Sequence, residues 1–526
     1  MTLKFRSLFK TEPSKMDLEM EEVPAAYLQT ENGALSLSTS QSARVDFFFK
    51  LTRDVVENES FEKWLLNSWK ESPIDTIKII FNSRDCRGGK GDRRPFLAAI
   101  HILSDNYPEW FEANYKLIPN YGRWLDLIEL YNILHNEKHK QLIVIYLVEK
   151  LCEDRREMDW GEFVSLLAKW IPTEKKKHDR NSDINDQICK QLFNVKIVNS
   201  FVMARYRKEY ISPLRAYIQL CERYMCANEW DKIHYSSVPS LAMKKYRKAF
   251  ERHSPEEFKK WLDDVKNKKQ KINAKQLYPH ELVRVYLDKI HLYRPELDEV
   301  IEEQWKALVE NTKTLGSFEN ALAICDVSGS MEGTPMDVSV ALGILVASCT
   351  KSPFDNLVIS FSEKPTFIEF DNNSSLLEKV KTIMKMDWGM NTDLEKVFKM
   401  ILNKATETHI SQDEMPKKLF VFSDMQFDEA DNKTKTNFEN IKELYKSHGY
   451  EMPQLIFWNL RSNNTQDMPV KYNEKGVALL SGYSPSLFKS ILSGTEKDLT
   501  PYSIMRKVID DERYDAIQIP QSTNNQ

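Results

Sequence analysis

The chain has 526 residues, of which 41% are hydrophobic and 29% are charged, and its formal net charge is −4. This length suits two or three domains, and the apolar fraction is high enough for packed cores, which excludes a mainly disordered chain. The seven cysteines are scattered, with no CxxC pair, and no run of about 18 apolar residues occurs, which argues against a disulfide framework, a zinc ribbon and a membrane partner. We therefore expect a soluble protein in the cytoplasm, with the nucleus as the alternative.

The charges are unevenly distributed along the chain. Residues 203–275 contain 18 basic and 9 acidic side chains, whereas residues 317–526 contain 22 basic and 30 acidic side chains. Such a division favours an anionic partner for the first part and a cation for the second.

Residues 1–44 form a polar lead-in, and residues 45–316 read as helical almost throughout. Apolar side chains recur there at spacings of three and four, and several helix starts carry cap signals, such as Ser254 followed by Pro255. No fixed repeat length is present, so we expect an all-α, HEAT-type array of helix pairs. The expected helices are 61–81, 97–103, 124–134, 141–152, 163–170, 213–225, 240–252, 256–265, 280–292 and 296–309.

The pattern changes after residue 316. Short β-rich runs alternate with amphipathic helices over residues 317–500, which predicts a Rossmann-like α/β domain with a mostly parallel sheet, followed by a tail at residues 501–526. The expected strands are 322–327, 357–361, 366–370, 419–423, 455–459 and 477–481. The expected helices are 336–349, 375–384, 392–403, 436–448 and 485–493.

Oxygen-bearing side chains lie at the ends of two predicted strands and at the start of one predicted helix. Asp326, Ser328 and Ser330 lie on the turn after the first strand, Thr392 precedes a helix, and Asp424 ends another strand. Because parallel strands end at one edge of a sheet, we expect these groups to meet and to bind one Mg²⁺, which prefers oxygen ligands. Two alternatives stay open: the serines only cap a helix, or the fold is retained without a metal.

This set resembles the metal-ion-dependent adhesion site of the von Willebrand factor A family in its order and its context. The resemblance implies that the metal is not catalytic. It also implies that one coordination position is filled by an acidic side chain of a protein partner.

Further motifs are spread over nearly the whole chain, at residues 32–34, 46–49, 84–94, 119–126, 238–246, 277–281 and 477–483. Taken in order, these motifs resemble a little-characterised family of plants, fungi, protists and giant viruses. That family is distantly similar to the Ro autoantigen. Ro joins a ring of helical repeats, the TROVE region, to a von Willebrand A domain and binds small noncoding and misfolded RNA.

Several basic segments are candidates for binding RNA. Glycines or aromatic residues interleave the cations, an arrangement that suits phosphate contacts and base stacking. The alternative for each segment is a solvated helix face with aromatic residues in the core. The candidate residues are Arg84, Arg87, Lys90, Arg93, Arg94, Arg205, Arg207, Lys244, Lys245, Arg247 and Lys248.

The leading hypothesis is a non-enzymatic RNA-binding scaffold of the ribonucleoprotein type with a Mg²⁺-dependent ligand site. The alternative is a protein-interaction adaptor whose metal captures a partner carboxylate without RNA. An enzyme is the least favoured class, because no histidine occurs in the three predicted metal loops to act as a base.

Overall fold

The protein is represented by a computed structural model that describes residues 26–172, 174, 182–291, 296–351, 353–361, 365–385, 393–430, 434–462, 467–492 and 499–520. The chain divides into two compact units. The first unit comprises residues 1–26, 97–218 and 518–526, and the second comprises residues 27–96 and 219–517.

The described part of the first unit is helical. Helix α9, the longest of its helices, begins where the Asn136 side chain accepts hydrogen bonds from two backbone amides, and it ends at Gly161, whose φ of 76° closes the helix. Its residues Ile143, Leu147 and Leu151 recur at four-residue spacing and are buried. The helices are α5 (Arg93–Asn106, shared with the second unit), α6 (Pro108–Asn114), α7 (Ile118–Tyr121), α8 (Trp124–Ile133), α9 (Glu137–Trp160), α10 (Leu167–Trp170), α11 (Ile184–Phe193), α12 (Ser200–Tyr206) and α13 (Ser212–Tyr217).

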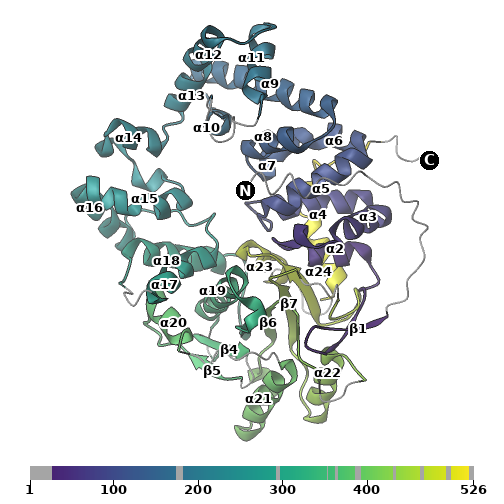
Figure 1. The fold of residues 1–526 in the computed structure, drawn as a ribbon. Helices are drawn as coiled ribbons and strands as arrows, with labels where there is room; N and C mark the ends of the chain where they lie inside the picture. Colours follow the sequence, from purple (N-terminus) through teal and green to yellow (C-terminus); the bar gives the residue numbers. More distant parts are fainter. Residues whose placement is uncertain are drawn as a thin grey trace. The chain divides into compact units, whose positions relative to one another are not determined.

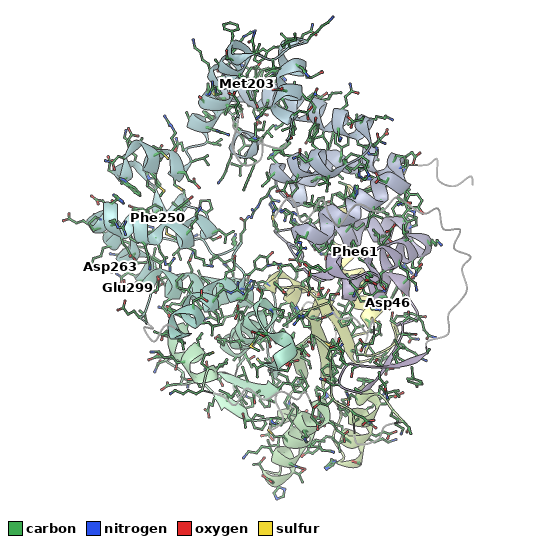
Figure 2. All side chains as sticks on the ribbon, in the orientation of Figure 1. Asp46, Phe61, Met203, Phe250, Asp263 and Glu299 are labelled. Carbon is green, nitrogen blue, oxygen red and sulfur yellow. The ribbon has the colours of Figure 1, made fainter. Side chains whose placement is uncertain are left out.

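The second unit combines helices from before and after its sheet. Phe250 on α15 (labelled in Figure 2) packs with Phe258 and Trp261 of α16 in a buried aromatic cluster. The helices before the sheet are α2 (Ala43–Lys50), α3 (Phe61–Glu71), α4 (Pro73–Arg84), α14 (Cys221–Ala227), α15 (Ser240–His253), α16 (Pro255–Lys266), α17 (Pro279–His291) and α18 (Glu299–Lys313). The later helices are α19 (Thr334–Cys349), α20 (Leu376–Ile383), α21 (Leu394–Glu407), α22 (Asn437–Ser447), α23 (Phe488–Leu492) and α24 (Pro501–Ile509).

A six-stranded mixed sheet forms the core of the second unit, and its strand order is β5-β4-β3-β6-β7-β8. Four of its five neighbouring pairs are parallel, and only the edge strand β5 is antiparallel to its neighbour β4. A separate hairpin pairs β1 (Tyr27–Gln29) with β2 (Leu35–Leu37). The strands of the sheet are β3 (Ala321–Asp326), β4 (Leu357–Phe361), β5 (Phe367–Glu369), β6 (Lys418–Ser423), β7 (Gln454–Asn459) and β8 (Val477–Ser481).

The sheet is covered by helices that are apolar where they meet it. Helix α19 packs on β3, β4 and β6 (Figure 1). Gly343 allows this approach, because a Cβ there would lie 2.1 Å from the Cys325 sulfur. Helices α2 and α24 both contact β8, although more than 400 residues separate α2 from α24 in the chain. The strand order reverses between β3 and β6, where the carboxyl ends of doubly wound sheets form a crevice.

The predicted order of a helical region followed by an α/β region is confirmed. All six expected strands are present, and two of them, Leu357–Phe361 and Val477–Ser481, have the expected bounds. The compact units nevertheless do not divide at residue 316, because α2–α4 and α14–α18 belong with the sheet. The expected tail contains α24, and the expected lead-in contains the β1–β2 hairpin. The HEAT-type repeat stays a prediction.

Candidate metal centre

Asp326 and Asp424 lie at the carboxyl ends of two neighbouring central strands. Cys325 of β3 pairs with Phe422 of β6, so the next residue of each strand, Asp326 and Ser423, lies at the same edge of the sheet. The Ser423 hydroxyl donates a hydrogen bond of 2.5 Å to Oδ2 of Asp326. Asp424 follows directly, so the strand register brings two carboxylates to this edge.

The turn after β3 places two serine hydroxyls beside these carboxylates. The backbone N–H of Ser328 donates to Oδ1 of Asp326 over 2.9 Å, and this bond holds the turn against the strand end. The hydroxyls of Ser328 and Ser330 are 3.1 Å apart, and Ser330 also hydrogen-bonds to Asp424. Ser328 is buried whereas Ser330 is exposed, so the site is open to solvent on the Ser330 side.

Burial strongly disfavours the charged forms of both acids. Asp326 is 0% exposed and Asp424 is 2% exposed. Burial, and then repulsion from Asp424, raise the pKa of Asp326 above its ordinary value. Burial also raises the pKa of Asp424, although hydrogen bonds from Ser330 and from the Gln426 backbone N–H partly oppose this effect. Nearby positive charge would therefore favour the charged forms of the two carboxyl groups.

Arg461 supplies part of that charge from the end of the next strand. It lies two residues after β7, and its guanidinium donates to the carbonyl oxygen of Ser330. Its charge lowers the pKa of Asp424. Its partner in this contact is the neutral carbonyl oxygen of Ser330.

The residues present fit a hard divalent cation. Two carboxylates and two hydroxyls form an oxygen-only donor set, which Mg²⁺ prefers while it keeps several waters. A dication would also oppose the repulsion from Asp424 that adds to burial in raising the pKa of Asp326. When bound there, Mg²⁺ would supply an open Lewis-acid position at the Ser330 side.

The remaining predicted ligand, Thr392, lies outside the described residues. Its neighbour Asp393 is described and caps α21, where its carboxylate accepts from the backbone N–H of Lys396 over 2.9 Å. Asp393 also forms an ion pair of 3.1 Å with the Lys396 side chain. These contacts explain Asp393 as the N-cap residue of α21.

The N-terminal hairpin supports the loop that carries Asp424. The side-chain amide of Asn32 donates to the carbonyl oxygen of Gln426 over 2.7 Å, and Oε1 of Gln426 accepts from the backbone N–H of Glu31 over 2.7 Å. The Thr30 hydroxyl donates to the carbonyl oxygen of Phe427. These contacts give the motif at residues 32–34 a structural role beside the candidate site.

Three contributors to the site were not predicted from the sequence: Ser423, Gln426 and Arg461. Ser423 could have been found, because it directly precedes Asp424 at the end of a predicted strand. Arg461 carries a weaker signal, since it follows another predicted strand by two residues. The backbone N–H of Gln426 donates to Asp424, and contacts with the β1–β2 hairpin, nearly 400 residues away, hold Gln426 in place. No local sequence pattern indicates the contacts with the hairpin.

The prediction that Lys90 contacts RNA is wrong, because its side chain is fully buried. Its ammonium donates to the carbonyl oxygens of Phe48 and Leu51 over 2.6 and 3.0 Å, and to the Ser481 hydroxyl over 2.6 Å. Burial lowers the pKa of Lys90 to about 7. Arg84 is only 3% exposed, so the expectation that it reaches a phosphate chain is wrong as well.

The glycines of the segment 84–94 serve close packing. A Cβ on Gly89 would lie 2.2 Å from the carbonyl oxygen of Asn82. Gly91 has a φ of 72°, and the Tyr278 hydroxyl occupies the space that a Cβ would take. Asp85 is buried and accepts two hydrogen bonds from the Arg513 guanidinium over 2.7 and 2.8 Å. The segment therefore packs closely against other parts of the second unit and helps to hold them together.

The other candidate cations differ in exposure. Arg93 and Arg94 are half-buried, and Arg94 pairs with Glu57 over 3.0 Å. Lys244 and Arg247 are also half-buried, and Arg247 pairs with Asp298 over 2.8 Å. The exposed cations are Arg87, Arg205, Arg207, Lys245 and Lys248.

The aromatic residues interleaved with the basic residues differ in burial. Phe250 is fully buried, and Tyr206, next to Arg205 and Arg207, is 3% exposed, so the core alternative holds for these two rings. Tyr246 is partly buried and packs against the same hydrophobic cluster as Phe250, whereas Tyr217 is 38% exposed.

Comparison with known proteins identifies the family. A model of the family described as "Domain of unknown function (DUF2828)" matches residues 30–162 and 146–318, which is more than half of the chain. The chain belongs to the DUF2828 family. A second model, "Domain of unknown function (DUF7788)", matches residues 320–523. Both descriptions leave the function open.

Two further comparisons concern whole proteins. "Uncharacterized protein L728" of Acanthamoeba polyphaga mimivirus is 32% identical over 518 residues, which cover 91% of this chain and 87% of that protein. This relative confirms a giant-virus member of the family. The crystal structure of the Deinococcus radiodurans RO (RSR) protein matches with a TM-score of 0.35 and 12% identity, covering 89% of this chain and 93% of that one. At this TM-score the likeness supports no conclusion about function.

Proposed function

We propose that this DUF2828 protein is a non-enzymatic binding protein whose sheet edge holds one Mg²⁺, in the manner of a von Willebrand factor A domain. The cation would be held by Asp326, Ser328, Ser330 and Asp424, with the sequence-predicted Thr392 as a further ligand. The observation that carries the proposal is the pair of buried, neighbouring carboxylates at the switch point of the sheet.

The open side of this edge indicates what would be bound. Ser330 is exposed, so a ligand from solvent can approach the cation there. A carboxylate is the natural occupant, because it is a hard anionic oxygen ligand and the two protein carboxylates leave a dication's coordination incomplete. We therefore favour an acidic side chain of a protein partner over a small-molecule substrate.

Metal binding can be tested on the full chain by thermal unfolding with increasing MgCl₂. A cation at 100 times its Kd stabilises the folded protein by about 2.7 kcal/mol. We expect Asp326→Ala to abolish this shift and Asp371→Ala, which removes an exposed acid elsewhere in the unit, to retain it. An equal Mg²⁺ shift in wild type and Asp326→Ala would overturn the proposed site.

Partner binding can be tested by affinity recovery in Mg²⁺ and in EDTA. We expect a specific protein to be recovered by wild type and Asp371→Ala in Mg²⁺. It should be lost in EDTA and with Asp326→Ala, and a partner recovered equally in every case would contradict capture through the metal.

RNA binding is the second candidate, and the exposure of Arg87, Arg205, Arg207, Lys245 and Lys248 favours it. Contacts between these cations and phosphates would make binding fall steeply with salt. The test is RNA binding by the purified chain at low and high salt, compared with Arg205→Ala/Arg207→Ala. Absence of binding at low salt would reject this candidate and leave the metal-site proposal unaffected.

A further inference from the structure

A cluster of two histidines and one aspartate lies in the first unit and involves none of the residues above. His101 and Asp105 are one turn apart on α5, so their side chains share a face of the helix. His135 lies in the short connection between α8 and α9, between the C-cap Leu134 and the N-cap Asn136. Two helix ends thus hold the backbone of His135 beside α5.

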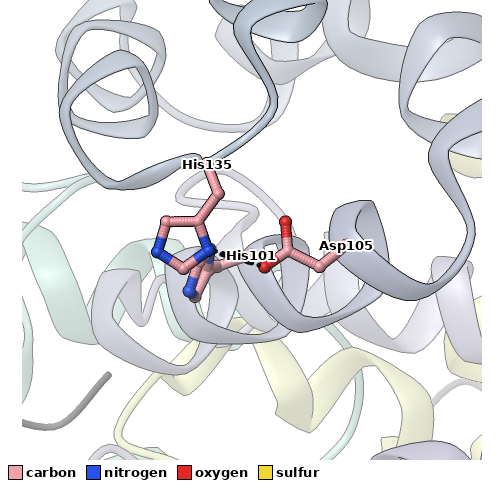
Figure 3. Close-up of side chains that lie close together, drawn as sticks. All are labelled: His101, Asp105 and His135. Atoms are coloured by element: carbon pink, nitrogen blue, oxygen red, sulfur yellow. Dashed lines mark hydrogen bonds and ion pairs between the residues drawn. The ribbon is translucent and has the colours of Figure 1, made fainter. Parts of the chain in front are cut away.

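The three side chains converge (Figure 3). Nδ1 of His135 is 3.0 Å from Oδ2 of Asp105, and Nδ1 of His101 is 3.9 Å from the same oxygen. One ligand atom from each residue lies within 4.8 Å of the others. Ligand atoms of a tetrahedral zinc ion are about 3.4 Å apart, given bonds of about 2.0–2.1 Å. Small side-chain rotations would therefore give the required spacing.

The cluster has one buried side and one open side. The side chain of His101 is 5% exposed, that of Asp105 is 27% exposed, and that of His135 is 66% exposed. The buried histidine can thus anchor an ion whose other side faces solvent.

A simple histidine–carboxylate pair accounts for only part of this geometry. The contact between His135 and Asp105 would suffice for such a pair. The His101 ring, however, lies edge-on to the His135 ring with centroids 4.7 Å apart, so two imidazoles face one carboxylate. Two imidazoles and one carboxylate suit Zn²⁺ and similar ions, whereas Mg²⁺ prefers oxygen ligands alone.

We propose that His101, Asp105 and His135 bind one Zn²⁺-class ion, with water completing its coordination on the open side. The ion would join α5 to the α8–α9 connection and thereby stabilise the first unit. The site is separate from the Mg²⁺ site and does not depend on the proposed function.

The test is Zn²⁺ binding by the full-length protein in competition with a chromophoric chelator. His135→Ala is the main variant, because its side chain is mostly exposed and its loss should leave the fold intact. His234→Ala, which removes an exposed histidine of the second unit, is the matched control. Loss of an outer-sphere partner weakens metal sites by 10–100-fold, so loss of a direct ligand should weaken this one by at least about 100-fold.

We expect wild type, His234→Ala and Asp326→Ala each to bind the same high-affinity equivalent of Zn²⁺, and His135→Ala and His101→Ala to lose it. Excess MgCl₂ should not displace the ion. Thermal unfolding should shift upward with Zn²⁺ in wild type and not in His135→Ala. Equal Zn²⁺ affinity in wild type and His135→Ala, or no high-affinity equivalent in wild type, would overturn the proposal.

Discussion

The segment 84–94 and the carboxyl edge of the sheet both carry conspicuous charged motifs, yet they balance their charges in opposite ways. In the segment, buried Lys90 has three oxygen acceptors and buried Asp85 has the Arg513 guanidinium. At the sheet edge, Asp326 and Asp424 lie buried near each other, and the guanidinium of Arg461 contacts a carbonyl oxygen.

This difference separates a structural motif from a candidate binding motif. Polar groups whose hydrogen bonds are made inside the fold have little left to offer a ligand. At the sheet edge, repulsion from Asp424 adds to burial in raising the pKa of Asp326, and an added cation would oppose both effects. The sign of the neighbouring charges is therefore a better guide here than the residue types of the motif.

The largest expected effect comes from Lys90→Met in the internally balanced segment. The substitution removes three hydrogen bonds of the ammonium and leaves the Phe48 and Leu51 carbonyls with only the Ser481 hydroxyl as a shared donor, which should cost about 4 kcal/mol of unfolding free energy. Urea unfolding measures this cost, and Lys245→Met, at an exposed lysine, is the control. A loss below about 1 kcal/mol would show that Lys90 is not a structural anchor.

The next effect is expected for Ser423→Ala at the sheet edge. This variant removes the 2.5 Å hydrogen bond to Asp326, which should cost about 2 kcal/mol because the acceptor is ionisable. Mg²⁺ affinity should fall roughly 10-fold, as is usual when a group that orients a ligand is lost. Calorimetric titration of Mg²⁺ checks this, and unchanged affinity would mean that Ser423 does not position Asp326.

A smaller effect concerns pH. In the cation-free protein the raised pKa of Asp326 stabilises the fold below the ordinary carboxyl pKa of 3.8, and this contribution is lost as pH rises through the raised value. Mg²⁺ binds the carboxylate form, so its stabilisation should grow with pH, by roughly 1 kcal/mol between pH 5 and 7. Melting curves at both pH values test this. A Mg²⁺ shift independent of pH in wild type would contradict it.

The smallest effect is expected for the exposed cations. Arg207→Ala and Lys248→Ala should change the unfolding free energy by less than about 0.5 kcal/mol, because both side chains lie at the surface. Chemical denaturation measures this change. A loss above about 1 kcal/mol for either variant would mean that the cation is part of the folded framework and not a free candidate for RNA.

Membrane-spanning length and apolarity do not occur together in any helix of the described residues.

The alternation of strands and helices was predictable because the strands are short apolar runs with polar residues at or near their ends. Leu357–Phe361 and Val477–Ser481 were predicted to the residue for this reason. The meeting of Asp326 with Asp424 was predictable too, since parallel strands end at one edge.

The division into units could not be predicted in the same way. Helix α24 was expected as part of a tail, yet it packs on β8 and contacts α2 and α4 from the far end of the chain. His101 and His135 are separated by 34 positions, and nothing in the intervening sequence indicates that they meet. Such contacts depend on how helices pack, which periodicity alone does not specify.

The alternation of strands and helices after residue 316, the bounds of two strands and the oxygen donors Asp326, Ser328, Ser330 and Asp424 could be read from the sequence, because they follow from local periodicity and from the order of parallel strands. Which charges are available depends on tertiary packing. It buried Lys90 against Phe48, Leu51 and Ser481, brought Arg461 to the Ser330 turn, and assembled the histidine cluster. The physical reason is that the ionisation and availability of a side chain depend on its solvation and partners, which long-range packing sets.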